Sequence, residues 1–221
     1  MSERRAALVI LCTAVASAAC GHPEQRIVDQ YFNALKQNDQ QTLTSFATVV
    51  IDKKVDNWKI TGGAPETRSP AVLPDLTRKV GELEAELAAN KKAAGAYSLE
   101  HYADIEKTKD AQKAGKPVPK VLGDVAEAWA KFADKDRDLK KQVAEAKAAV
   151  ERERRNVALS VGQVADIEKL TGEMVEKQLD LDLTIAGEVK PYSMTLRKYE
   201  MTGGTGRMVS RWVIQQLKPK G

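Results

Sequence analysis

The amino-acid sequence predicts an α+β fold in which a long antiparallel helical hairpin interrupts a small antiparallel sheet and its helices. Apolar residues recur at helical spacing near the N-terminus, step by fours and threes through the middle, and alternate with polar residues in the last third. These periods are typical of short helices, a coiled coil and half-buried strands, respectively. After a signal segment (1–19), we therefore expect an α+β domain from residues 20–63 and 171–221, with 64–170 as an inserted hairpin.

The first twenty residues predict bacterial export. Arg4 and Arg5 precede an uncharged, mostly apolar run that ends at Ala19 and is too short to span a membrane. The tripeptide 18–20 resembles the core of a lipobox, in which Cys20 becomes the lipidated N-terminus. Ser17 departs from that pattern, because lipoproteins usually carry Leu or another aliphatic residue there.

The alternative is cleavage by ordinary signal peptidase after Ala18, which would release a soluble periplasmic protein. Gly21, rather than Asp, follows the cysteine. By resemblance to the enterobacterial sorting rule, this favours the outer membrane over the inner membrane. The expected location is the cell envelope, with the chain facing the periplasm and held by fatty acids such as palmitate on Cys20.

Two short helices are expected after Pro23, which suits a first helical position. The pair Asn38-Asp39 breaks the helical pattern and can cap a second helix. Extended segments are then predicted at 49–51 and 55–60, before the turn residues 61–63. The apolar face of the two helices comprises Ile27, Val28, Tyr31, Phe32, Leu35, Leu43 and Phe46.

The middle of the chain has coiled-coil spacing in two arms separated by a break at 114–119. The connection is too short for parallel helices, so the arms are expected to fold back on each other as a hairpin. Each arm of about 36 residues, at about 1.5 Å per residue, would project about 50 Å. The stepping positions are Leu76, Val80, Leu83, Leu87, Asn90, Ala94, Tyr97, His101 and Ile105, then Val125, Trp129, Phe132, Asp136, Leu139, Val143, Ala146, Val150, Glu153 and Val157.

A turn centred near Lys116 fixes the register of the predicted hairpin. That register places Leu83 opposite Val150 and Asn90 opposite Val143. It also brings the Tyr97 hydroxyl to the Asp136 carboxylate, since a buried carboxylate needs a partner. The remaining predicted pairs are Leu76 with Val157, Val80 with Glu153, Leu87 with Ala146, Ala94 with Leu139, His101 with Phe132, and Ile105 with Trp129.

The last third predicts an antiparallel meander of three strands. Leucines and an isoleucine alternate with polar residues over 179–185, and similar alternation follows over 189–200 and 208–217. The turns at 187–188 and 202–206 are short and rich in glycine, as antiparallel neighbours require.

Composition excludes several classes of function. The net charge of +4 is mild and well mixed, so no basic stripe predicts nucleic-acid binding. Once Cys12 leaves with the signal and Cys20 is modified, no thiol remains for a disulfide or a cysteine metal site. Only His22 and His101 remain as imidazoles, in distant segments. We therefore expect no metal and no cofactor.

The order of elements resembles the nuclear-transport-factor-like fold, the cone-shaped α+β scaffold shared with ketosteroid isomerase and polyketide cyclases. The resemblance is carried by residues 27–39 with Leu43 and Phe46, and by Arg211-Trp212-Val213-Ile214 near the end. It covers about 24–60 and 174–218. It implies a small curved sheet packed on the N-terminal helices. The insertion from about 64 to 170 departs from the family, whose members have a short helix or loop there.

The resemblance also names a candidate cavity. Tyr31 lies where isomerases of this family carry an oxyanion-binding tyrosine, a chemistry that also needs a carboxylate base on a neighbouring strand. Asp52 is the carboxylate nearby, although it is off register. The simpler interpretation is that Tyr31 packs on the sheet, and the sequence supplies no catalytic set of residues.

A second candidate site is the tip of the hairpin, where Lys109, Lys113, Lys116 and Lys120 surround the turn. These lysines are either simply solvated or contact an acidic partner. Three functions follow for the whole chain. The favoured one is a non-catalytic envelope lipoprotein that binds or holds an envelope protein. The alternatives are a small-ligand binder or isomerase-like enzyme using the cone cavity, and a structural spacer that self-assembles. The sequence leaves the oligomeric state open.

Overall fold

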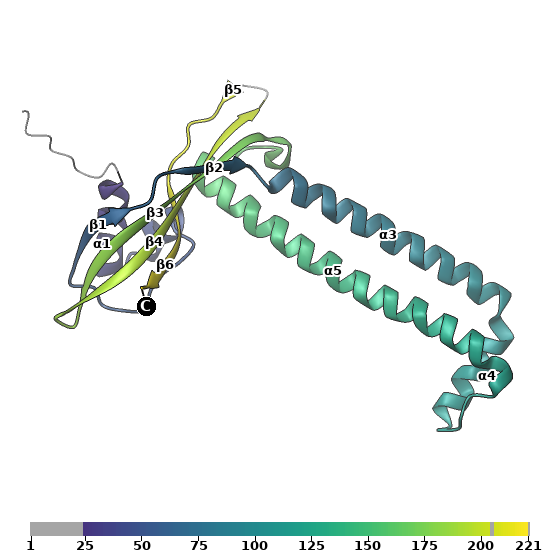
Figure 1. Cartoon of the computed structure of the whole chain (residues 1–221). Coiled ribbons are helices and arrows are strands. Elements are labelled where there is room, and N and C mark those ends of the chain that lie inside the picture. The colour runs from purple at the N-terminus through teal and green to yellow at the C-terminus, as the bar shows by residue number, and fades with distance from the viewer. Residues whose placement is uncertain (1–23, 204–205, 221) are drawn as a thin grey trace, which may run out of the picture.

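A computed structural model describes residues 24–203 and 206–220, with a small curved sheet at one end and a helical hairpin projecting from it (Figure 1). The predicted α+β fold class is confirmed, with antiparallel strands, N-terminal helices and an interrupting hairpin. The predicted signal segment and Cys20 lie outside the described residues.

α1 (Gln25–Lys36) and α2 (Gln40–Phe46) form the predicted N-terminal pair. Asp39 is the N-cap of α2, because its Oδ1 accepts a hydrogen bond from the Thr42 N–H at 3.0 Å. Such a cap satisfies a backbone donor that the helix itself cannot pair. The residues that the two helices bury in the core shared with the sheet are Val28, Tyr31, Phe32, Ala34, Leu43 and Phe46.

The sheet contains six strands in the described residues, all paired antiparallel. β3 (Thr171–Ile185) and β4 (Glu188–Gly203) form its long central hairpin, which turns at Ala186-Gly187. Both turn residues have positive φ, 53° and 80°, as a tight two-residue hairpin turn requires. β1 (Asn57–Gly63) and β2 (Thr67–Pro70) pair with β3, whereas β5 (Gly206–Arg207) and β6 (Val213–Pro219) pair with β4.

Several local predictions about strands were wrong. The segment 49–51 is not a strand, the short strands β2 and β5 were not predicted, and β3 begins at Thr171 rather than at Leu179. The last strand begins at Val213 rather than Met208, because the backbone N–H and carbonyl of Arg211 form hydrogen bonds with α5 instead of with a neighbouring strand. The Arg211 N–H donates to the Ser160 carbonyl at 3.0 Å, and the Ser160 hydroxyl donates to the Arg211 carbonyl at 2.9 Å.

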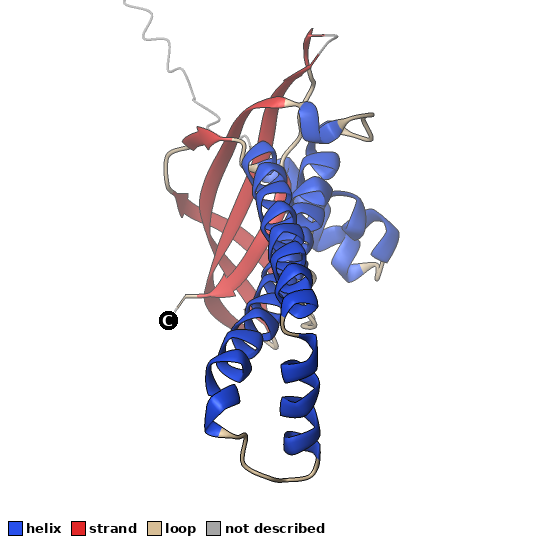
Figure 2. Cartoon of the chain, turned by 90° about the vertical axis from the view of Figure 1, so that its right-hand side faces the viewer, coloured by secondary structure: helices blue, strands red, loops and turns tan. Residues whose placement is uncertain are grey.

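The hairpin consists of three α-helices: α3 (Leu73–Glu100), α4 (Tyr102–Lys113) and α5 (Gly123–Val161). Single 3₁₀ turns precede and follow α5, at Lys120–Leu122 and Ile167–Lys169. α3 and α5 run side by side in opposite directions, and α4 turns away from α3 at the tip (Figures 1 and 2). With 39 residues, α5 is about 58 Å long.

The predicted register of the hairpin was wrong. Leu83 packs in a cluster with Leu139 and Val143, whereas Val150 belongs to a separate cluster at the base. The Asn90 amide donates to the Phe132 carbonyl at 3.2 Å instead of lying opposite Val143. The partners of α3 therefore lie nearer the start of α5 than a turn at Lys116 implies.

The register differs from the prediction because the first arm breaks at His101. The backbone there (φ −112°, ψ 23°) ends α3, and α4 begins at the next residue. The predicted contact between Tyr97 and Asp136 is absent as a result. The Tyr97 ring lies 5.6 Å from the Phe132 ring and 4.3 Å from His101. Asp136 instead pairs with Lys140 on its own helix, at 2.6 Å.

Candidate functional site

Tyr31 lies in the filled interior of the body. Its side chain is fully buried, and its hydroxyl donates to the Val49 carbonyl at 3.1 Å. Burial raises the pKa of this phenol. The surrounding side chains come from both layers and are themselves buried: Phe32, Leu179, Leu181, Leu183, Met194, Leu196 and Ile214. Side chains thus occupy the space that a ligand of the cone would need.

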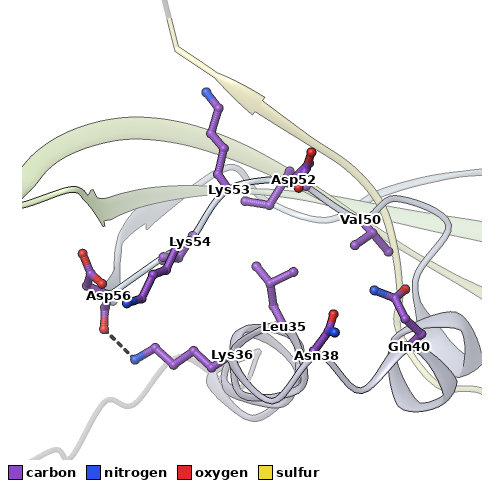
Figure 3. Close-up of a pocket in the computed structure, with 11 residues that line it drawn as sticks. Leu35, Lys36, Asn38, Gln40, Val50, Asp52, Lys53, Lys54 and Asp56 are labelled. Carbon is purple, nitrogen blue, oxygen red and sulfur yellow. Dashed lines mark hydrogen bonds between the residues drawn. The ribbon is translucent and has the colours of Figure 1, made fainter.

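Asp52 lies elsewhere, on the rim of an open pocket of about 780 Å³ between the end of α1 and the segment 50–56 (Figure 3). Tyr31 does not line this pocket. The structure therefore does not bring the two predicted cavity residues together, and the candidate pair fails as one site. The full lining is Leu35, Lys36, Asn38, Gln40, Val50, Ile51, Asp52, Lys53, Lys54, Val55 and Asp56.

The chemistry of this pocket is that of a solvated surface. Lys36 is already engaged, since its Nζ donates to the Asp56 carbonyl at 2.5 Å and lies 4.6 Å from the centre of the Trp58 ring. Lys53 Nζ is 3.4 Å from the Tyr192 hydroxyl. The lining holds no histidine, cysteine or serine, so it offers no nucleophile activated by a base.

The tip lysines divide into two kinds. Lys109 is part of the packed tip, since its Nζ pairs with Glu106 at 2.9 Å and lies 5.6 Å from the Trp129 ring. Its hydrogen bond holds the pKa of the Glu106 carboxyl below the usual range. The other three predicted site lysines are exposed and form no ion pair within the described residues: Lys113, Lys116 and Lys120.

Sequence reasoning missed the apolar character of the same tip. Leu99, Tyr102 and Val121 are 85%, 65% and 87% exposed, although large apolar side chains are usually covered. Leu99 and Tyr102 flank the break at His101, and Val121 lies just before α5. The sequence signal that could have revealed their exposure is that all three lie outside the apolar stepping positions of the coiled coil. Exposed apolar side chains mark a contact surface where they form one contiguous patch.

Two shallow grooves flank the seam below the tip, with volumes of about 470 and 400 Å³. Asn90 and Phe132 border both grooves. Small residues form much of the remaining lining: Ala89, Ala93 and Ala128 on one side, and Ala94, Gly95, Ser98 and Ala133 on the other. Small side chains leave room for a neighbouring helix to approach closely.

The base of the hairpin is joined to the sheet by a buried polar network. Glu153 of α5 is 6% exposed, and its Oε1 accepts a hydrogen bond from the Tyr199 hydroxyl at 2.8 Å. Burial, reinforced by the nearby Glu153 charge, raises the pKa of Tyr199. Arg197 lies 3.9 Å from Glu153 and donates to Glu176 at 2.9 Å.

Ser160 adds a second junction. Its hydroxyl accepts from the Tyr199 N–H at 2.9 Å and donates to the Arg211 carbonyl. An apolar cluster encloses these contacts: Ala71, Leu73, Val150, Val157, Ile167, Leu170, Tyr199 and Met201. Because side chains of the hairpin and the sheet share this cluster, the arm has a fixed attachment.

Fold and site together define an α+β domain with a projecting hairpin whose tip is apolar and basic. Comparisons with protein-family models, with curated proteins and with solved structures gave no significant match. Within residues 24–203 and 206–220, no helix has the length and hydropathy to cross a membrane. The same residues contain no group of three or more metal-ligating side chains.

Proposed function

We propose that this protein is a lipid-anchored cell-envelope protein that acts without catalysis, as a scaffold whose hairpin binds an envelope protein. The observation that carries the proposal is the exposure of Leu99, Tyr102 and Val121 at the end of an arm with a fixed base. Such side chains are typical of a contact surface, with Lys113 and Lys116 as its polar rim.

The geometry of the chain supports the same function. α1 lies on the side of the body away from the hairpin tip (Figure 1). Because Cys20 is only four residues before Glu24, a lipid on Cys20 would hold this side close to the membrane. The tip would then reach more than about 50 Å into the periplasm.

The body serves as the base of the arm in this proposal. Its helices and curved sheet are consistent with a nuclear-transport-factor-like scaffold, to which we assign no inherited activity. The filled interior around Tyr31 speaks against use of the cone as an isomerase site.

The proposal is tested by photo-crosslinking in cells. A photoreactive amino acid replaces Leu99, Tyr102 or Val121, one at a time, and Gln142 on the exposed shaft of α5 serves as the control position. We expect one protein to be crosslinked from all three tip positions and not from Gln142. Crosslinks of equal intensity at all four positions, or none at the tip, would contradict tip binding.

Two further results separate this proposal from its alternatives. Crosslinks from the tip to a second copy of the chain would favour the self-assembling spacer. Metabolic labelling with palmitate tests the anchor separately: labelling should be lost in Cys20→Ala, whereas absence of label from the wild-type protein would favour the soluble periplasmic form.

A further inference from the structure

A second pocket, of about 480 Å³, lies beside the first turns of α1 and has a lining unlike that of the other pockets. Its lining combines two arginines, Arg26 and Arg211, with Trp212. The rest of its lining is Ile27, Gln30 and Phe46. This mixture of cationic, aromatic and apolar groups is not explained by the function of the hairpin.

The charge at this pocket is uncompensated. Arg26 is exposed and has no ion pair with a described residue. The Arg211 guanidinium donates to two carbonyl oxygens, those of Leu159 at 2.7 Å and Ser45 at 2.9 Å. Those bonds fix its position but leave its positive charge unpaired. Lys198 lies 4.5 Å from the Trp212 ring, but its charge is already paired with Glu66 at 3.9 Å and Glu200 at 3.6 Å.

The positive surface continues beyond the pocket. Arg211 also lines an adjacent pocket of about 550 Å³, together with Arg154, Arg155 and Glu151. Arg154 forms ion pairs with Glu151 at 3.0 Å and with Glu168 at 3.6 Å, so its charge is compensated. Arg155 is exposed and forms no ion pair within the described ranges. Arg26, Arg211 and Arg155 therefore give the two neighbouring pockets an excess of positive charge, which attracts anions.

The pocket also lies close to the proposed anchor. Glu24 is 2% exposed and pairs with Lys177 of β3 at 2.6 Å, which fixes the start of α1 to the sheet. Four peptide units separate it from Cys20, so the two Cα atoms are at most about 15 Å apart. Arg26 follows two residues later.

We propose that this pocket binds the head group of an anionic phospholipid in the membrane that holds the anchor. The Arg26 guanidinium suits the phosphate, since Arg matches phosphate oxygens with paired N–H donors, and Arg211 adds a second positive charge. Trp is favoured at the membrane–water interface, and Ile27 and Phe46 provide apolar surface beside it. The inference rests on the lipid anchor of the proposed function but not on tip binding. It makes the first turns of α1 the membrane-facing side of the body.

The test uses the lipidated protein in vesicles of phosphatidylcholine with increasing phosphatidylglycerol. Trp212 becomes the only tryptophan through Trp58→Phe and Trp129→Phe, and its protection from acrylamide quenching is measured. Protection should rise with phosphatidylglycerol and saturate. Arg26→Gln should raise the mole fraction for half-maximal protection about fivefold, which corresponds to about 1 kcal/mol.

The matched control is Arg137→Gln, which removes the same charge from an exposed residue on the shaft of α5 and should change nothing. Equal effects of the two substitutions, or no protection by phosphatidylglycerol, would overturn the proposal. Protection by inorganic phosphate alone, in neutral vesicles, would show that the pocket binds a free anion and would overturn the proposal that it binds a lipid head group. If the chain proves to lack the lipid, the proposed anchor fails. The same titration with added vesicles then still tests whether the pocket binds phosphatidylglycerol.

Discussion

The body and the hairpin are stabilised in different ways. The body has a contiguous core in which helices and strands bury Phe32, Leu181 and Leu196 almost completely. The middle of the hairpin has only a thin seam, whose buried apolar members are Leu83, Leu139 and Val143. Between its arms, surface ion pairs such as Glu84 with Lys147 add little, because such pairs contribute about 0–1 kcal/mol each.

The difference shows where the protein depends on exact packing. The body must keep its core intact to hold the base of the arm. The hairpin needs only enough seam to remain helical, which leaves its outer surface available for contacts. The buried network around Glu153 and Tyr199 connects the body to the hairpin.

The largest expected effect separates the two cores. Leu196→Ala should lower the free energy of unfolding by about 3–5 kcal/mol, because it leaves a cavity in a filled interior. Leu83→Ala should cost less, about 1–3 kcal/mol, since the thin seam can collapse around it. Urea denaturation measures the free energy of unfolding of both variants. Equal losses would contradict the difference in packing between the body and the hairpin.

The next effect concerns a glycine of the sheet. Gly172 has φ +153°, and a Cβ added to it would lie 2.2 Å from the Glu200 carbonyl oxygen. Gly172→Ala should therefore destabilise the protein by about 2–3 kcal/mol, because the backbone of β3 or β4 would have to move to make room for the Cβ. The midpoint of thermal unfolding reports the loss, and an unchanged midpoint would show that the strand can shift freely.

The junction should show a dependence on pH. Tyr199→Phe removes the hydrogen bond to buried Glu153 and should cost about 1–3 kcal/mol at neutral pH. Because the pKa of Tyr199 is raised from 10.0 in the folded state, its contribution is present below pH 10 and is lost as pH rises above it. Urea titrations across pH 8–11 should give a shallower alkaline decline for Tyr199→Phe. Tyr102→Phe, at an exposed position, should behave as the wild type does.

The smallest effect has the opposite sign. Gly81 lies on α3, and a Cβ added there would meet no atom within 4 Å. Gly81→Ala should stabilise the chain by about 0.5–1 kcal/mol, because Ala loses less backbone entropy in a helix. A loss of helicity, measured by circular dichroism, would contradict the assignment of an open helical surface at this position.

Local periodicity was enough to predict the fold class. The alternation over 179–185 and the heptads of the arms follow from which face of each element is buried, and that information is present in each segment. The register of the hairpin was not predictable in this way. It depends on the break at His101, where the sequence Glu100-His101-Tyr102 contains neither Gly nor Pro to signal it.

The candidate site was predictable only in part. The tip lysines were visible as a charge cluster, whereas the exposure of Leu99 and Tyr102 was indicated only by their position outside the apolar stepping of the coiled coil. The pairing of Tyr31 with Asp52 failed because the segment 49–51 leaves the sheet, and the Tyr31 hydroxyl takes the Val49 carbonyl. Glu153 was predicted at a core position, but its partner Tyr199 is 46 positions away, so their contact has no local signal.

The central claim is that the hairpin is held as a fixed arm on the body. Spin labels on Val121→Cys at the tip and Val189→Cys at the far turn of the sheet, both exposed positions, measure the distance between them by pulsed electron resonance. A single narrow distance distribution is predicted, which should broaden in Tyr199→Phe. A broad or multiple distribution in the otherwise wild-type chain would show that the arm swings, and the account would be wrong.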